Sequence, residues 1–108
     1  MGNTICCEHD LPDRRGYPYP PACLYDTVDM MVSKDYKERF KAEYWQTRIR
    51  YEKLKKLNTQ LEAHEDILKD EKGPKHDSPA YLLRNQQRQM GEYLHILELR
   101  AEFEHIEL

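Results

Sequence analysis

An apolar stripe with the spacing of a helix constrains the fold of this chain more than any other feature of its sequence. Between residues 36 and 68, apolar or small side chains recur at intervals of three, four or seven positions, which places them on one helical face. This first stripe comprises Tyr36, Phe40, Tyr44, Thr47, Tyr51, Leu54, Leu61 and Leu68. A second stripe comprises Leu83, Met90, Leu94, Leu97, Ala101 and Leu108. The spacing predicts two long helices, over residues 34–70 and 79–107.

Capping residues define a short connection between these helices. Ser33 is a suitable N-cap for the first helix, and the Gly-Pro pair at 73–74 is expected to stop it. Ser78 followed by Pro79 is a typical helix start. Two long helices joined so closely pack antiparallel. The chain is therefore predicted to be all-α, with a coiled-coil-like, antiparallel two-helix hairpin over residues 33–108.

Folding the chain about residue 74 predicts which side chains face one another across the hairpin. Tyr51 is expected opposite Leu97, and Thr47 opposite Ala101. Because Thr47 and Ala101 are both small, their pairing predicts a gap between the helices, flanked by tyrosines. Nearer the connection, a polar layer is expected to fix the register. Its members are Asn58, Gln86 and Gln87.

Both helices also carry apolar residues on a second face, away from the predicted core. The first helix contributes Ala42, Trp45 and Ile49, and the second contributes Ile96, Leu99, Phe103 and Ile106. A helix that is apolar on two faces is buried on both. This face is therefore expected to be the interface of a homo-oligomeric helical bundle, anchored by Trp45. Two alternatives are that the N-terminal arm wraps over the face and that the face captures a different protein.

Residues 1–32 are a separate, proline-rich segment that is predicted to be an irregular arm. Two methionines stand directly before the first helix, so one interpretation of the arm is an upstream extension of the gene. No secretory leader or membrane-spanning run is recognised. Cys6, Cys7 and Cys23 are accordingly expected to be reduced cytosolic thiols that bind no metal.

The charges are unevenly distributed, although the net charge is only −3. Residues 34–56 carry nine Lys or Arg and four Asp or Glu, whereas residues 92–108 carry one Arg and five Glu. Antiparallel packing would neutralise much of the basic field, which argues against a nucleic-acid partner. Because a glycine-rich phosphate loop and a nucleophile signature are also absent from the sequence, we expect neither an enzyme nor a cofactor.

Basic and aromatic residues of the first helix supply a candidate ligand site. Tyr44 and Tyr51 have planes on which a nucleobase can stack, and Arg48 and Arg50 can bind phosphate. The alternative is that the tyrosines simply fill the hairpin core and that the arginines form a solvated edge beside it.

Two longer runs of the sequence are SKDYKERFKAEYWQTRIRYEKL and SPAYLLRNQQRQMGEYLHILELRAEFEHIEL. Together they resemble a family of small conserved phage and prophage proteins related to a crAss-like phage protein. The resemblance covers about residues 33–108 and leaves the arm outside. It implies a phage-encoded two-helix protein of the bacterial cytoplasm, with no catalytic motif. Small phage proteins of this kind are associated with counter-defence, which is an inference by analogy.

We therefore expect a non-enzymatic binding protein that acts against host defence, with a nucleotide second messenger as its candidate ligand. One alternative is an interaction module that inhibits a host defence protein through its apolar back face. The other is a nucleic-acid-binding regulator. No membrane partner is expected.

Overall fold

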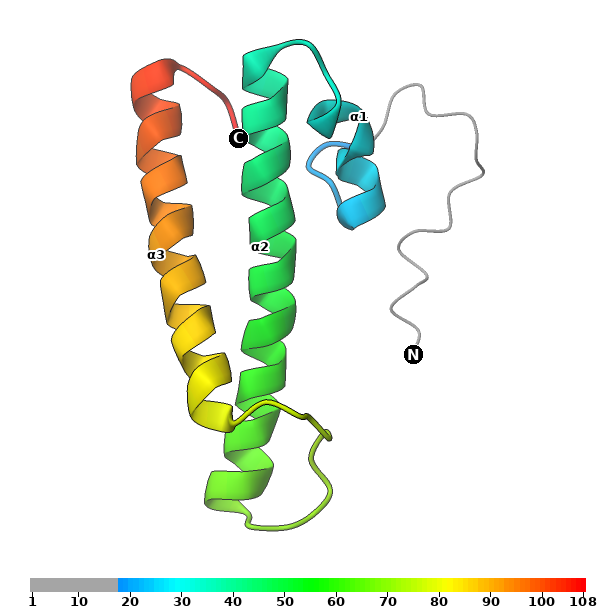
Figure 1. Ribbon diagram of the computed structural model, residues 1–108, viewed down its shortest axis with the longest axis vertical. Coiled ribbons are helices and arrows are strands. Elements are labelled where there is room, and N and C mark those ends of the chain that lie inside the picture. Colours follow the sequence, from blue (N-terminus) through cyan, green and yellow to red (C-terminus); the bar gives the residue numbers. More distant parts are fainter. Residues whose placement is uncertain (1–17) are drawn as a thin grey trace.

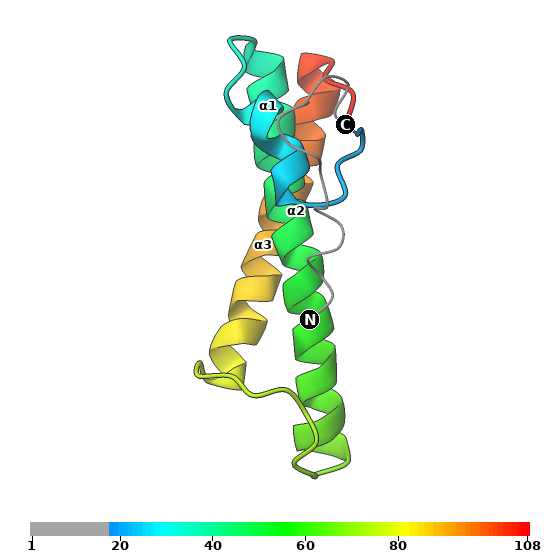
Figure 2. The same ribbon diagram turned by 90° about the vertical axis from the view of Figure 1, so that its right-hand side faces the viewer.

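Two long helices make up most of the protein. The computed structural model describes residues 18–108, and all the regular secondary structure in this range is helical, which confirms the predicted all-α class. Helix α2 spans Tyr36–Leu61 and helix α3 spans Ala80–Glu104. The two helices lie side by side and run in opposite directions (Figure 1). Figure 2, turned by a quarter, shows that they cross at a shallow angle.

Three shorter helical elements complete the described chain. A 3₁₀ turn, η2 (Leu24–Thr27), leads directly into the short helix α1 (Val28–Met31). A π-helical turn, η3 (Glu62–Ile67), extends the far end of α2. Part of the segment expected to be irregular is therefore helical, since η2 and α1 both lie within residues 1–32.

The helical path of α2 and η3 ends earlier than expected, just before a left-handed residue rather than at the glycine and proline. Lys69 has a φ of 56°, a conformation that turns the chain away from the helix. The amide of Leu68 donates to the carbonyl of Ala63 at 2.8 Å, and the amide of Asp70 donates to that of His64 at 2.9 Å. These bonds satisfy the last carbonyls, so the helical path stops at Ile67 and the connection begins sooner.

Helix α3 also ends early, and the chain then folds back. His105 adopts a left-handed conformation with a φ of 58°, and the amide of Ile106 donates to the carbonyl of Ala101 at 2.9 Å. This reversal turns residues 105–108, here named the tail, toward α2. Ile106 is consequently buried in the core instead of lying on an outer face, where it was predicted.

The core lies between α2 and α3, near the end where the tail folds back. Its buried members are Phe40, Tyr44, Leu94, Leu97, Ala101 and Ile106. The pairing is displaced from the prediction, since Tyr51 lies opposite Gly91, where an added Cβ would be 3.4 Å from the Tyr51 ring. The displacement follows from the early end of the first helix. The chain turns about a point nearer residue 70 than residue 74.

A polar layer lies between the helices toward the connection, as predicted. Asn58 is buried, and its amide nitrogen donates to the Leu83 carbonyl at 3.1 Å and to the Gln87 side-chain oxygen at 2.8 Å. Gln86 is exposed and stays outside the layer. Since burying an amide is costly unless it is hydrogen-bonded, these contacts favour the observed register over its neighbours.

The segment before α2 packs on the side of α2 opposite to α3 (Figure 1). Met30 and Thr27 are fully buried there, and the Gln46 side chain donates to the Thr27 hydroxyl at 2.8 Å. Ala42 lies one turn before Gln46 on the same helical face and is also buried. Part of the second apolar face of α2 is thus covered by the chain itself, which was one of the alternatives left open by the sequence.

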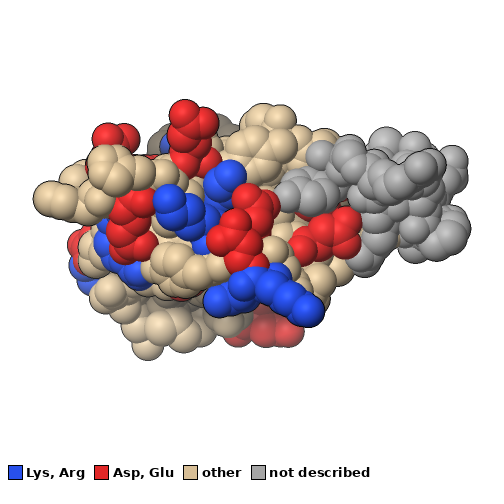
Figure 3. Space-filling model, turned by 90° about the horizontal axis from the view of Figure 1, so that it is seen from above, with Lys and Arg blue, Asp and Glu red and all other residues tan. Residues whose placement is uncertain are grey.

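The end of the molecule where α2 begins and α3 ends carries both signs of charge. Seen from above, Lys and Arg side chains lie beside Asp and Glu side chains across this face (Figure 3). The Tyr36 hydroxyl donates to Glu104 at 2.9 Å, and the guanidinium of Arg100 bonds to Glu104 at 3.0 Å. Glu104 and Arg100 bring opposite charges together, and the hydrogen bonds from Tyr36 and Arg100 hold the pKa of Glu104 below its usual value.

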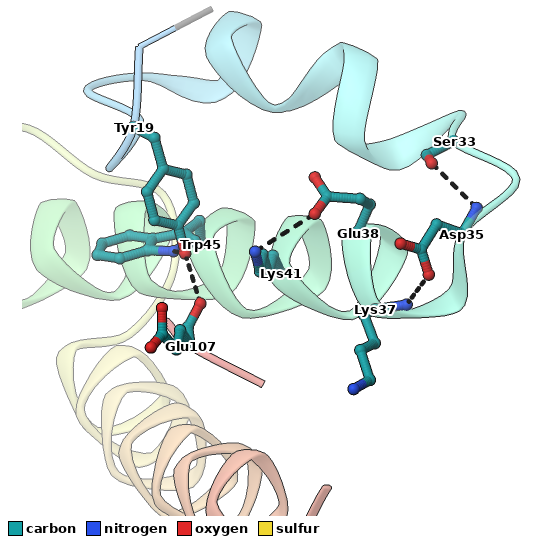
Figure 4. Close-up of polar contacts among 8 residues, drawn as sticks. All are labelled: Tyr19, Ser33, Asp35, Lys37, Glu38, Lys41, Trp45 and Glu107. Carbon is teal, nitrogen blue, oxygen red and sulfur yellow. Dashed lines mark hydrogen bonds and ion pairs between the residues drawn. The ribbon is translucent and has the colours of Figure 1, made fainter. Parts of the chain in front are cut away.

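Helix α2 begins at this end with two successive caps (Figure 4). The amide of Asp35 donates to the Ser33 hydroxyl at 3.0 Å, and the amide of Lys37 donates to the Asp35 carboxylate at 3.0 Å. Asp35 is therefore the N-cap of α2, two residues later than the expected Ser33. An acidic cap also suits the positive end of the helix dipole.

Candidate ligand-binding site

A cavity of about 700 Å³ lies between α2, the second half of α3 and the tail. This volume is within the range of small-molecule sites in proteins. The lining is contributed by two parts of the chain that are distant in sequence, namely α2 and the end of α3 with the tail that follows it. The residues that line it are Tyr44, Trp45, Arg48, Glu98, Ala101, Glu102, His105, Ile106, Glu107 and Leu108.

A hydrogen-bonded network of Tyr44, Glu98 and Arg48 forms one wall of the cavity. The Tyr44 hydroxyl donates to Glu98 Oε2 at 2.7 Å and accepts from Arg48 Nη1 at 3.1 Å. Burial, and then the hydrogen bond to Glu98, raises the pKa of Tyr44 above its usual value. The phenol therefore stays neutral and keeps Glu98 and Arg48 in fixed positions on either side of it.

Aromatic rings and a guanidinium are stacked at the same wall. The rings of Tyr44 and Trp45 meet edge to face, with centroids 5.2 Å apart. The Arg48 guanidinium carbon lies 5.2 Å from the centre of the Trp45 ring and 6.0 Å from that of Tyr44. Cation–π attraction of this kind holds the guanidinium near the rings. The wall thus offers a flat apolar surface next to a permanent positive charge.

A second, smaller cavity of about 200 Å³ lies further along the same pair of helices. Arg48 and Glu98 line both cavities, and Tyr51 and Gly91 line only this one. A third, mostly apolar cavity of about 270 Å³ lies on the other side of Trp45 and is also lined by Arg48. Arg48 is therefore the residue that these three cavities share.

The larger cavity combines hydrogen-bond acceptors with one permanent cation. Of the described residues that line it, Arg48 carries the positive charge, whereas Glu98, Glu102 and Glu107 carry carboxylates. Carboxylates accept hydrogen bonds from hydroxyl and amino groups, and a guanidinium binds phosphate oxygens. The arrangement suits a ligand with a planar ring, several hydroxyl groups and a compact anionic group.

The structure brings together three of the four predicted ligand residues. Tyr44 and Arg48 line the larger cavity, and Tyr51 joins Arg48 at the smaller one. Arg50 lies two residues beyond Arg48, about 200° further around the helix, and lines none of the cavities described above. It is an exposed residue.

The predicted gap between Thr47 and Ala101 is replaced by a different opening. Ala101 lines the larger cavity, but Thr47 lines neither that cavity nor the smaller one. Sequence reasoning also missed Glu98 and the tail. Glu98 would have been found with the correct register, since it lies opposite Tyr44. The tail lacks a comparable signal, because its reversal depends on a left-handed His105.

The predicted interface residues fall into two groups. Ala42 and Ile106 are buried within the chain, and Trp45 and Ile49 are half-buried on the face toward the N-terminal segment. The remaining three are exposed on α3, and Phe103 is the most exposed, at 83%. They are Ile96, Leu99 and Phe103.

Residues 18–108 contain no cluster of three or more His, Cys, Asp or Glu side chains that could hold a metal ion. Cys23 is buried and disulfide-bonded, so the expectation of a free thiol is wrong for this residue. Cys6 and Cys7 lie outside the described residues. Across the same described range, the helices are too short or too polar to cross a bilayer.

Comparison with known proteins identifies a family. No curated protein and no solved structure matches the chain. A protein-family model, described as Sequestin, matches residues 34–103, a range that contains α2, the connection and nearly all of α3. The name of the family denotes a sequestering protein. Since the match covers more than half of the sequence, the chain belongs to the Sequestin family.

Proposed function

We propose that this protein sequesters a nucleotide second messenger and acts as a phage-encoded counter-defence protein in the bacterial cytoplasm. The observation that carries the proposal is the Arg48–Tyr44–Glu98 network at the wall of the larger cavity. The family name supports the sequestering role. The protein binds its ligand without chemical change, so it lowers the free concentration of the messenger.

Each part of a nucleotide has a counterpart in the cavity. The base stacks against Trp45, where aromatic contact contributes about 1–3 kcal/mol per base. Arg48 binds the phosphate, with its guanidinium held in place by the Tyr44 hydroxyl. Glu98 and Glu102 accept hydrogen bonds from the ribose hydroxyls. The three carboxylates near Arg48 also disfavour ligands with many phosphate charges, because like charges repel.

The proposal includes a scaffold and an assembly. Helices α2 and α3 form an antiparallel hairpin whose register places Glu98 beside Tyr44. The exposed apolar residues of α3, led by Phe103, join copies of the chain into a helical bundle. Assembly of this kind would supplement the small core of a single chain.

The test is a titration of the purified protein with a panel of cyclic mononucleotides, cyclic dinucleotides and ADP-ribose-type nucleotides. At least one of these is expected to bind, and Arg48→Ala is expected to weaken that binding roughly 10- to 100-fold, the effect of losing charged hydrogen bonds. Arg50→Ala is the matched control, since it removes the same charge from α2 at an exposed position outside the cavities. The affinity of the Arg50→Ala variant for the nucleotide should equal that of the unmodified protein.

Two results would contradict the proposal. One is the absence of binding by every nucleotide in the panel. The other is an equal loss of affinity in both variants, which would indicate a general charge effect. Circular dichroism of each variant checks that the helices are intact. Chromatography of the ligand after release should return it unchanged, because the proposal involves no catalysis.

The alternative of a nucleic-acid-binding regulator receives less support from the arrangement of charges. Binding of a nucleic-acid duplex requires a basic face that neighbouring acidic side chains do not neutralise. The face seen in Figure 3 mixes basic and acidic side chains. The alternative of a host protein partner would use the exposed α3 residues Ile96, Leu99 and Phe103. It predicts that Phe103→Ser abolishes capture of that protein and leaves nucleotide affinity unchanged.

A further inference from the structure

One residue of the N-terminal segment connects that segment to two parts of the molecule that line the cavity, α2 and the tail. The Tyr19 hydroxyl donates to the backbone carbonyl of Glu107 at 3.1 Å, and it accepts from the Trp45 indole nitrogen at 3.2 Å (Figure 4). The rings of Tyr19 and Trp45 meet edge to face, with centroids 6.1 Å apart. One hydroxyl group therefore joins the N-terminal segment, α2 and the tail.

The tail that Tyr19 holds is part of the cavity wall. His105, Ile106, Glu107 and Leu108 all line the cavity, so they supply four of its ten lining residues. The tail begins at the left-handed His105, and both the Ile106 amide bond to Ala101 and the burial of the Ile106 side chain anchor its start. Further along the tail, the hydrogen bond from the Tyr19 hydroxyl ties the backbone carbonyl of Glu107 to the N-terminal segment.

Two further contacts keep Tyr19 in place. The Lys41 ammonium lies 5.3 Å from the centre of the Tyr19 ring, a cation–π distance. The preceding turn of α2 holds Lys41 itself through an ion pair with Glu38 at 3.3 Å (Figure 4). The ring is thus positioned by α2 from two directions, by Lys41 and by Trp45.

We propose that Tyr19 is a positioning residue that clasps the tail against α2 and thereby closes one side of the ligand cavity. Its hydroxyl bonds to Trp45 and Glu107, both of which line the cavity, although Tyr19 does not. Tyr19 and Glu107 lie outside residues 34–103, the range matched by the family model. The clasp therefore uses residues on both sides of the range that the family model matches. Its consequence for binding rests on the proposed function.

Closing the cavity is expected to lower the dissociation rate of the ligand more than it changes which ligand is recognised. Related binding sites usually differ in affinity through the dissociation rate. A sequestering protein benefits from slow release because each messenger stays out of circulation for longer. The clasp is expected to contribute to this retention without touching the ligand.

The experiment compares Tyr19→Phe with the unmodified protein, and Tyr81→Phe is the matched control. Tyr19→Phe removes the hydroxyl and keeps the ring, whereas Tyr81→Phe removes the same group from an exposed position near the start of α3. Trp45 is the only tryptophan, so its fluorescence reports directly on the clasp. Quenching by acrylamide and hydrogen exchange of the tail are measured without ligand. Stopped-flow dissociation is measured with the nucleotide from the panel that binds.

Tyr19→Phe is expected to increase both acrylamide quenching and tail exchange, and to speed ligand dissociation about fivefold, as the loss of hydrogen bonds of ordinary strength implies. The association rate should change little. The control variant should match the unmodified protein in all three measurements. Unchanged quenching and exchange in Tyr19→Phe would overturn the clasp itself, whether or not any nucleotide binds. A looser tail with an unchanged dissociation rate would overturn its role in closing the cavity.

Discussion

The hydroxyl of Tyr44 donates a hydrogen bond of 2.7 Å to Glu98, so a buried ring on α2 is joined to a carboxylate on α3. The same hydroxyl accepts from Arg48. This contact is both a link between the two helices and the element that orients the only permanent cation among the described residues lining the larger cavity. Stability and binding are therefore expected to change together when it is altered.

Tyr44→Phe is expected to lower the free energy of unfolding by about 1 kcal/mol, the usual net value of a hydrogen bond. It should also weaken nucleotide binding, since Arg48 loses the group that holds it. Urea unfolding and titration provide the two measurements. Glu98→Gln and the double variant complete a mutant cycle. An interaction energy near zero between positions 44 and 98 would contradict a direct coupling.

Two glycine substitutions are expected to have opposite effects on stability. Gly91 lies within α3, and an added Cβ would meet the Tyr51 ring at 3.4 Å, an ordinary contact. Gly91→Ala should raise the free energy of unfolding by up to about 1 kcal/mol, because alanine favours a helix more than glycine does. At Gly73, an added Cβ would lie 2.8 Å from the Cβ of His64, so Gly73→Ala should destabilise the connection. Thermal unfolding of both variants gives the comparison, and equal shifts would contradict these packing distances.

Gly91→Ala also tests which of the two cavities between α2 and α3 holds the ligand. Gly91 lines the smaller cavity and is absent from the lining of the larger one. Nucleotide affinity should therefore be unchanged in this variant if the ligand occupies the larger cavity. A marked loss of affinity in a stabilised protein would assign the ligand to the smaller one.

The connection between η3 and α3 is expected to lose order in acid. The amide of Lys72, and then the ring of His64, lowers the pKa of Asp70 below its usual value. The contribution of Asp70 is therefore present above its unfolded-state pKa and is lost as the pH falls through the lower folded-state value. Asp70→Asn should remove this dependence of the connection on acidic pH. Exchange of the Lys72 amide, which donates to Asp70 at 2.9 Å, is the direct measurement.

The same connection is expected to lose a second contact in base. Glu65, and then the Ser78 carbonyl, raises the pKa of His76 above its ordinary value. The contribution of His76 is present below its unfolded-state pKa and is lost as the pH rises through the raised folded-state value. NMR titration of the His76 ring should show this elevation, and Glu65→Gln should reduce it. An identical titration in both proteins would exclude the contact.

Phe103→Ser is expected to reduce self-association. Phe103 is 83% exposed, and it lies on the same side of α3 as Ile96 and Leu99. Exposed apolar clusters of this kind favour association in water. Light scattering over a range of concentrations should show a smaller mean mass for Phe103→Ser than for the unmodified protein. Leu82→Ser provides a control, since Leu82 is exposed nearer the start of α3 and away from this cluster.

The sequence predicted the two long helices well because their apolar spacing is regular. It did not predict their register, because the register depends on where the first helix ends. That end is determined by Lys69 in a left-handed conformation, which is uncommon for a residue with a side chain, and it precedes the more conspicuous glycine and proline. Because the predicted turning point was too late in the chain, Tyr51 was expected opposite Leu97, whereas it lies opposite Gly91.

The candidate site was predicted in part for a related reason. Tyr44 and Arg48 lie one turn apart on one helix, so their proximity follows from helical geometry alone. Glu98, Tyr19 and Glu107 come from other parts of the chain, and their positions depend on tertiary packing. Trp45 was assigned to an oligomer interface, because the sequence does not show that Tyr19 bonds to its indole nitrogen.

The backward turn at His105 has a practical consequence for anyone who expresses this protein. Leu108 lines the cavity, so a purification tag or fluorescent protein fused directly after it would start at the wall of the candidate site. Such a fusion would obstruct the ligand or pull the tail outward, and a false negative would follow in any binding screen.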